Sequence, residues 1–120
     1  MIRPIKPSDN PHLAIIVRTT LAEHGCDKPG TAFADPETDF LYQQFQDENT
    51  AYFVVEAEGK IVGGAGIGKL KGYDDVCELQ KMYLLPEARG KGLAKMLMDT
   101  CIAFAKENGF KKPSGNGQIV

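Results

Sequence analysis

The sequence is poor in cysteine and histidine, and it lacks tryptophan and any long apolar run. The three cysteines, Cys26, Cys77 and Cys101, lie far apart, without a Cys-x-x-Cys pair or a histidine at zinc-ligand spacing. This pattern argues against disulfides and a metal site, and it favours reduced, non-catalytic thiols in a cytoplasmic protein. No stretch approaches the roughly 20 apolar residues of a membrane span, and the polar residues 1–11 do not resemble a signal peptide.

An excess of charge of either sign is also missing. The chain has 14 lysine and arginine residues against 16 aspartate and glutamate residues, a net charge of −2. Without a broad basic surface, it is not expected to bind nucleic acid or an anionic membrane. Because Arg89, Lys91 and Lys95 form a local basic cluster, the expected partner is a small anion. With 120 residues, 42% of them hydrophobic, the chain can form one domain around one core.

The spacing of apolar residues predicts a mixed α/β domain. Ser8-Asp9 followed by Pro11 is typical of a helix start, and Asp35-Pro36 repeats this arrangement. Aromatic and β-branched residues around Glu58-Gly59 predict a β-hairpin. The expected elements are a strand at 2–6, a helix from 8 to about 25, a connector at 26–35, a helix beginning at 35–37, hairpin strands at 52–56 and 60–70, a turn at 72–75, a strand at 76–85 and a helix from 93 to about 109.

Glycines are concentrated in the second hairpin strand, at positions 63, 64, 66 and 68. Such a run could be a nucleotide-binding loop, but no helix follows it. Glycine within a strand more often marks a bulge or a close approach of another part of the chain. We therefore interpret the run as part of a strand.

Arg89-Gly90-Lys91-Gly92-Leu93-Ala94 joins the last predicted strand to the last predicted helix. Glycine lets backbone amides approach an anion, and a helix N-terminus carries unsatisfied donors and about half a positive charge. A P-loop would need lysine and a hydroxyl residue after Gly92, and a dinucleotide fingerprint would need glycine at Lys95. The segment therefore predicts a pyrophosphate site, and a solvated surface turn is the alternative.

Residues 78–94 resemble the acetyl-CoA signature of the GNAT superfamily of N-acetyltransferases. The core of that signature is Gln/Arg-x-x-Gly-x-Gly/Ala, and Arg89, Gly92 and Ala94 meet its fixed positions. The order of predicted elements from residue 1 to about 110 also matches. The resemblance implies an α/β, GNAT-like fold with a mixed, mostly antiparallel sheet flanked by helices, and acetyl-CoA as the cofactor.

The resemblance also implies which residues bind that cofactor. Backbone amides of the turn and the first helical turn would hold the pyrophosphate of CoA, and the preceding strand would pair with its pantetheine arm. Transferred to this sequence, these positions are Arg89, Gly90, Lys91, Gly92, Leu93, Ala94 and Lys95 for the pyrophosphate, and Met82, Tyr83 and Leu84 for pantetheine.

Two residues of the same strand are candidates for catalysis. The resemblance implies that the Leu84 amide donates to the thioester oxygen and that Glu78 is the general base, directly or through a water. A solvated charge is the alternative for Glu78. Strand alternation predicts that Gln80, Met82 and Leu84 share a face with Glu78.

The chain departs from the family pattern after Phe110. The family continues with an apolar strand, a helix and a hairpin, whereas Pro113, Gly115 and Gly117 predict a flexible tail at 111–120. We therefore expect a GNAT domain at 1–110 that lacks the C-terminal strands, and a homodimer that covers the open sheet edge.

The predicted function is acetyl transfer from acetyl-CoA to a primary amine of a small molecule or peptide, by direct attack. One alternative is a CoA-binding module with little or no transferase activity, because part of the acceptor site would be absent. Another is a structural fragment that needs a partner and binds neither acetyl-CoA nor an amine.

Overall fold

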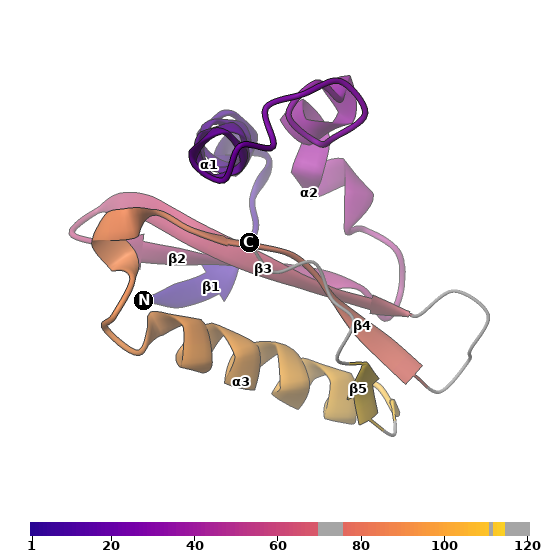
Figure 1. The fold of residues 1–120 in the computed structure, drawn as a ribbon. Helices are drawn as coiled ribbons and strands as arrows, with labels where there is room; N and C mark the ends of the chain where they lie inside the picture. The colour runs from indigo at the N-terminus through magenta and orange to yellow at the C-terminus, as the bar shows by residue number, and fades with distance from the viewer. Residues whose placement is uncertain (70–75, 111, 115–120) are drawn as a thin grey trace.

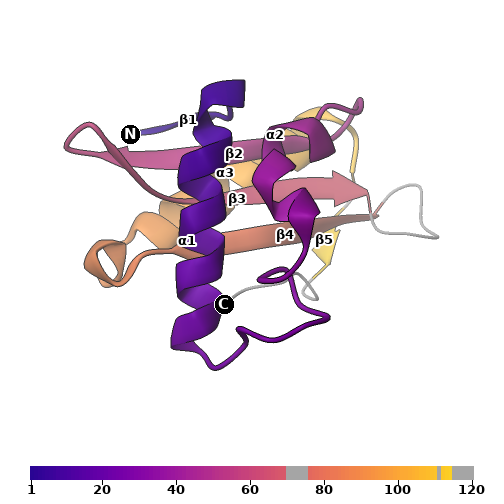
Figure 2. The ribbon, with the colours of Figure 1, turned by 90° about the horizontal axis from the view of Figure 1, so that it is seen from above.

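A computed structural model describes residues 1–69, 76–110 and 112–114. It consists of a sheet in the order β1-β2-β3-β4-β5, with α1 and α2 on one face and α3 on the other (Figure 1). Seen from above, α1 crosses the strands (Figure 2). The elements are β1 Ile2–Pro4, α1 Asn10–Glu23, α2 Leu41–Gln44, β2 Ala51–Ala57, β3 Lys60–Lys69, β4 Val76–Leu84, α3 Leu93–Glu107 and β5 Lys112–Ser114, with 3₁₀ turns at Pro7–Asp9, Pro36–Phe40 and Pro86–Ala88.

The first four strands pair antiparallel in chain order, and β2, β3 and β4 form the three-stranded meander that the sequence predicts. Glu58 and Gly59 connect β2 to β3 with positive φ angles of 55° and 77°. Two left-handed residues form the kind of tight turn whose twist matches that of the flanking strands. The predicted hairpin is therefore confirmed.

The prediction of a tail without strand structure is wrong at Lys112–Ser114. These residues form β5, which runs parallel to β4 and pairs with Val76–Glu78. The cause lies at the end of α3, where Gly109 has a φ of 83° and Phe110 is buried, so that the chain turns toward the sheet edge. The proline in β5 is tolerated because β5 is an edge strand. Residues 111 and 115–120 of the predicted tail, and the predicted turn at 72–75, lie outside the described residues.

The second predicted helix is shorter than its sequence pattern indicates. The Asp35 carboxylate accepts a hydrogen bond from the Glu37 amide at 2.9 Å, as expected for a helix cap. The 3₁₀ turn that follows ends at Phe40, whose backbone angles (φ −128°, ψ 44°) are not helical. Only α2 is therefore α-helical in this segment.

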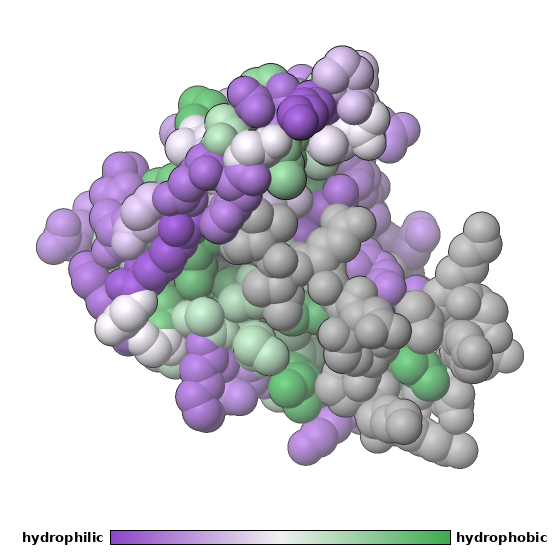
Figure 3. All heavy atoms as spheres, viewed as in Figure 1, coloured by the Kyte–Doolittle hydropathy of each residue, from purple (hydrophilic) through white to green (hydrophobic). Residues whose placement is uncertain are grey.

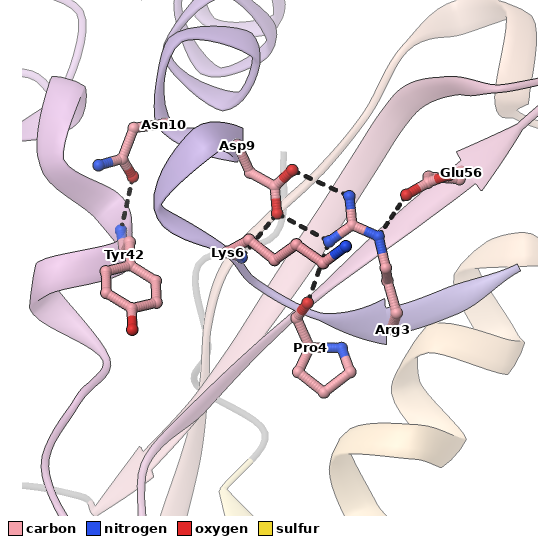
Figure 4. A network of polar contacts seen from close by, with 7 residues as sticks. All are labelled: Arg3, Pro4, Lys6, Asp9, Asn10, Tyr42 and Glu56. Carbon is pink, nitrogen blue, oxygen red and sulfur yellow. Dashed lines mark hydrogen bonds and ion pairs between the residues drawn. The ribbon is translucent and has the colours of Figure 1, made fainter.

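A charged network fixes the start of the chain against α1 and β2 (Figure 4). The Arg3 guanidinium donates to both carboxylate oxygens of Asp9, at 2.8 and 2.9 Å, and forms an ion pair with Glu56. Burial raises the pKa of Asp9, but hydrogen bonds from Arg3 and the Lys6 amide outweigh this effect and hold the pKa below its usual value. Asp9 is therefore a buried, ionised residue.

The hydrophobic core lies on both faces of the sheet. Burial raises the pKa of the Cys101 thiol to about 12 and that of Cys77 in the same direction, so both thiols stay protonated. No helix in the described part of the chain is long and apolar enough to cross a membrane. The core beneath α3 contains Val55, Val62, Ala65, Ile67, Cys77, Leu79, Met82, Leu84, Ala88, Leu97, Cys101, Ala105 and Phe110. The clusters beneath α1 and α2 contain Ile5, Leu13, Leu41, Phe45, Tyr52 and Val54, and Ile16, Val17, Leu21 and Tyr83.

Candidate functional site

The predicted anion site lies where the glycine turn, residues 89–92, leads into α3. Gly90 and Gly92 have φ angles of 78° and 76°, and a Cβ added to either would meet nothing within 4 Å. The first helical hydrogen bond runs from the Met96 amide to the Gly92 carbonyl at 3.1 Å. Among the described residues, no protein group accepts from the amides of residues 92–95. The turn thus presents free donors to open space, an arrangement that fits a bound phosphate.

Arg89 makes protein contacts through the groups that the sequence analysis assigns to a pyrophosphate. Its backbone amide donates to the Pro86 carbonyl at 3.2 Å, so it is not free for a phosphate. Its guanidinium donates to the Leu84 carbonyl, at 2.9 and 3.1 Å, and pairs with Glu23 at 2.7 Å. The hydrogen bond from Arg89 also lowers the pKa of Glu23. Arg89 therefore joins the end of β4 to the last residue of α1.

The two lysines of the predicted site are solvent-exposed. Lys91 belongs to the glycine turn itself, and its side chain makes no ion pair with the described residues. Lys95, in the first turn of α3, pairs with Asp99 one turn later at 2.9 Å. Lys91 is therefore the better placed of the two to add positive charge at the turn.

The outer edge of β4 is open beside this turn. The Leu85 amide donates to the Val62 carbonyl at 2.9 Å, and the next pair of the ladder is Leu84 with Gly63. Because antiparallel pairs alternate, the Leu84 N–H and C=O face away from β3, which agrees with the Arg89 contact to this carbonyl. β5 pairs only with Val76–Glu78, so within the described part of the chain the Leu84 amide faces an unpaired edge.

A β-bulge in β4 changes the predicted arrangement of its side chains. Gly64 pairs with Tyr83 but Gly66 pairs with Gln80, so β4 contains one extra residue at this point. Lys81 lies within the bulge and has a φ of 52°, in the left-handed region. An inserted residue reverses which face the following side chains occupy.

The prediction that Glu78 shares a face with Met82 and Leu84 is therefore wrong. Met82 and Leu84 pack beneath α3, in the same cluster as Leu79. Glu78 and Gln80 alternate with Leu79 and lie on the opposite face, that of α1 and α2. The Gln80 side-chain amide donates to the Glu78 carboxylate at 2.9 Å. The side chains of Glu78 and Leu84 thus belong to one strand but to different faces of the sheet, and the Leu84 amide lies at the edge between these faces.

The sequence analysis missed two residues that shape this site. Glu23 holds Arg89, and nothing in its local sequence indicates a partner 66 residues away. The Tyr52 hydroxyl donates to the Lys81 carbonyl in the bulge at 2.8 Å. For Tyr52 a signal was present, because strand pairing brings it opposite one of the glycines of β3.

Comparison with known proteins supports an acetyltransferase. Residues 18–113 match the Acetyltransferase (GNAT) family. The chain is 49% identical over 115 residues to the uncharacterized N-acetyltransferase YjgM of Escherichia coli strain K12, covering 93% of this chain and 68% of that protein.

Solved structures with the same fold include other acetyltransferases. A ribosomal-protein-alanine N-acetyltransferase from Brucella melitensis has a TM-score of 0.74 at 25% identity, over 92% of this chain and 69% of that chain. A predicted acetyltransferase from Clostridium acetobutylicum, solved with acetyl-CoA, has a TM-score of 0.78 at 19% identity, over 99% of this chain and 80% of that chain. The fold predicted from the sequence is thereby confirmed, and the chain belongs to the acetyltransferase (GNAT) family.

Proposed function

We propose that this protein transfers an acetyl group from acetyl-CoA to a primary amine of a small molecule or peptide, by direct attack. The observation that carries the proposal is the glycine turn before α3. Gly90 and Gly92 have left-handed backbone angles and open space around them, and the amides of residues 92–95 have no acceptor among the described residues. The acetyl-CoA in the Clostridium acetobutylicum protein of the same fold supports this choice of anion.

Two segments of the chain would bind the cofactor. The amides of residues 92–95, with the Lys91 side chain, would hold the pyrophosphate. The open edge of β4, from Met82 to Leu84, would pair with the pantetheine arm. Bound acetyl-CoA would supply the acetyl group as an activated thioester. The Leu84 N–H would donate to the acyl oxygen as negative charge develops on it, a contribution of about 3 kcal/mol for a preorganised donor.

Glu78 would accept the proton of the incoming ammonium, because only the neutral amine has a lone pair for attack. The carboxylate lies on the face of α1 and α2, so the amine would enter from that side. Glu78 and Leu84 are six residues apart along β4 with one residue taken up by the bulge, a separation of roughly 16 Å at the strand rise of about 3.3 Å. Glu78 would therefore take the proton along a chain of several waters, because neither direct contact nor a single bridging water spans this separation.

Titration calorimetry with acetyl-CoA tests the cofactor, and release of free thiol with a panel of amines tests the transfer. Binding with saturable thiol release is the expected result. Binding without thiol release would instead indicate a CoA-binding module. No binding at saturating concentrations would contradict the proposal as a whole.

The homodimer and the cytoplasmic location predicted from the sequence remain proposals. Apolar residues are visible at the surface along α3 (Figure 3). Met96 and Met98 on this helix are 53% and 37% exposed, and association would remove such groups from water. Light scattering coupled to size exclusion should show a dimer, and a monomer at high concentration would contradict this assembly.

A further inference from the structure

The Tyr52 side chain reaches across a neighbouring strand. Tyr52 belongs to β2, and its hydroxyl donates to the Lys81 carbonyl of β4 at 2.8 Å, although β3 lies between these two strands. The ring crosses β3 where that strand carries glycine. A Cβ on Gly64 would lie 2.5 Å from Cε1 of the ring, and one on Gly66 would lie 2.9 Å from Cδ2. Two glycines of β3 thus leave the space through which the ring passes.

The acceptor of this hydrogen bond belongs to the residue that makes the bulge. Lys81 has a φ of 52°, a conformation that side-chain-bearing residues disfavour, so contacts from the surrounding structure must hold it. Tyr52 is suited to this task because it is 1% exposed and packs against Phe45 with ring centroids 5.2 Å apart. Burial raises the pKa of Tyr52 well above its usual value, so the hydroxyl keeps the proton that it donates.

The bulge determines which face of the sheet each side chain of β4 occupies. It sets the side chains of Met82 and Leu84 beneath α3, and it leaves Glu78 on the opposite face. The orientation of the Leu84 amide at the open edge depends on the same register. We infer that Tyr52 is a positioning residue for acetyl transfer, which acts through the Lys81 carbonyl on the backbone that faces the acyl group. This inference rests on the proposed function.

Tyr52→Phe tests the inference because it removes the hydroxyl and keeps the ring. We expect amide hydrogen exchange at residues 80–84 to become faster, kcat to fall about fivefold to tenfold, and the Kd for acetyl-CoA to stay within about twofold. The Kd should change less than kcat, because the pyrophosphate site in the glycine turn lies on another segment and only the pantetheine contacts at Met82–Leu84 would be loosened. Tyr42→Phe is the matched control, since the Tyr42 hydroxyl makes no hydrogen bond with the described residues. It should leave all three quantities unchanged.

A second substitution tests whether the Tyr52 hydroxyl acts through the backbone conformation of Lys81. Lys81→Gly places a residue in the bulge that adopts a positive φ freely. In the Tyr52→Phe background it should restore most of kcat, because the bulge then keeps its positive φ without the hydrogen bond from the hydroxyl.

Unchanged exchange and kcat in Tyr52→Phe, in a protein that binds acetyl-CoA, would overturn this inference alone. Failure of Lys81→Gly to restore kcat in the Tyr52→Phe background would also overturn it. Failure of the wild-type protein to bind acetyl-CoA would overturn the proposed function and this inference together.

Discussion

Gly92 allows the proposed cofactor site to be tested separately from protein stability. It is the N-cap residue of α3 and has a φ of 76°, and no protein atom would lie within 4 Å of an added Cβ. A side chain at this position therefore meets no steric obstacle in the protein. Its effect on folding is limited to the left-handed backbone, whereas its effect on a ligand at the amides of α3 should be direct.

The two effects differ in magnitude. Gly92→Ala should lower the free energy of unfolding by roughly 1 kcal/mol, or about 3–6 °C in Tm, because alanine disfavours a positive φ. Gly92→Glu carries the same backbone cost and adds a carboxylate. At about 6 Å from one phosphate charge and an effective dielectric constant near 20, the repulsion amounts to roughly 3 kcal/mol. The Kd for acetyl-CoA should therefore rise about a hundredfold or more.

Gly109 provides the control on the same helix. It follows the C-terminal end of α3 with a φ of 83°, and an added Cβ would again meet nothing within 4 Å. Gly109→Ala should lower Tm by as much as Gly92→Ala and leave the Kd unchanged. Thermal unfolding and titration calorimetry measure the two quantities. A wild-type Kd in Gly92→Glu would refute the assignment of the glycine turn as the pyrophosphate site.

Two further predictions concern ionised residues. Glu78→Gln should leave the Kd for acetyl-CoA unchanged and shift the pH profile of kcat/KM to higher pH, and an unaltered profile would remove Glu78 from the mechanism. Asp9→Asn should lower the free energy of unfolding by about 1–3 kcal/mol, because the Arg3 guanidinium loses one of its two ionised partners and keeps only Glu56. The pKa of Asp9 is lower in the folded protein than in the unfolded chain, where it is about 3.9. The ionised Asp9 therefore stabilises the fold at pH values above about 3.9, and this contribution is lost as the pH falls through the lower pKa of the folded state. Denaturant unfolding from pH 7 to pH 2 should show this acid-dependent loss in the wild type and a smaller one in Asp9→Asn.

Local patterns were sufficient to predict most of the fold. Asp35 was recognised as a cap, and Glu58-Gly59 as a hairpin turn, because such signals depend only on neighbouring residues. β5 was missed for the converse reason. Its sequence disfavours a strand, and it pairs with β4 because the buried Phe110 brings the chain to that edge.

The site shows the same division between local and long-range information. The glycine turn was found because its residues are contiguous, whereas the side-chain contacts of Arg89 were not, because they depend on the distant Glu23. The faces of β4 were assigned by simple alternation. That assignment failed because β4 contains a bulge, which its own sequence does not indicate. The contacts of the bulge come from other strands: Tyr52 of β2 donates a hydrogen bond to it, and two glycines of β3 leave room for the Tyr52 ring.

The bulge also explains how one strand can serve two halves of a transfer reaction. A regular strand would set the Glu78 and Leu84 side chains on one face, and either the acidic group or the apolar one would then be in an unsuitable environment. With one residue inserted, Leu84 packs beneath α3 and Glu78 lies on the face of α1 and α2. The Leu84 amide remains in the plane of the sheet, at the edge between these two faces. A group bound at that edge could thus be approached from the side of Glu78, and the proposed anion site at the start of α3 would lie at the end of the same strand.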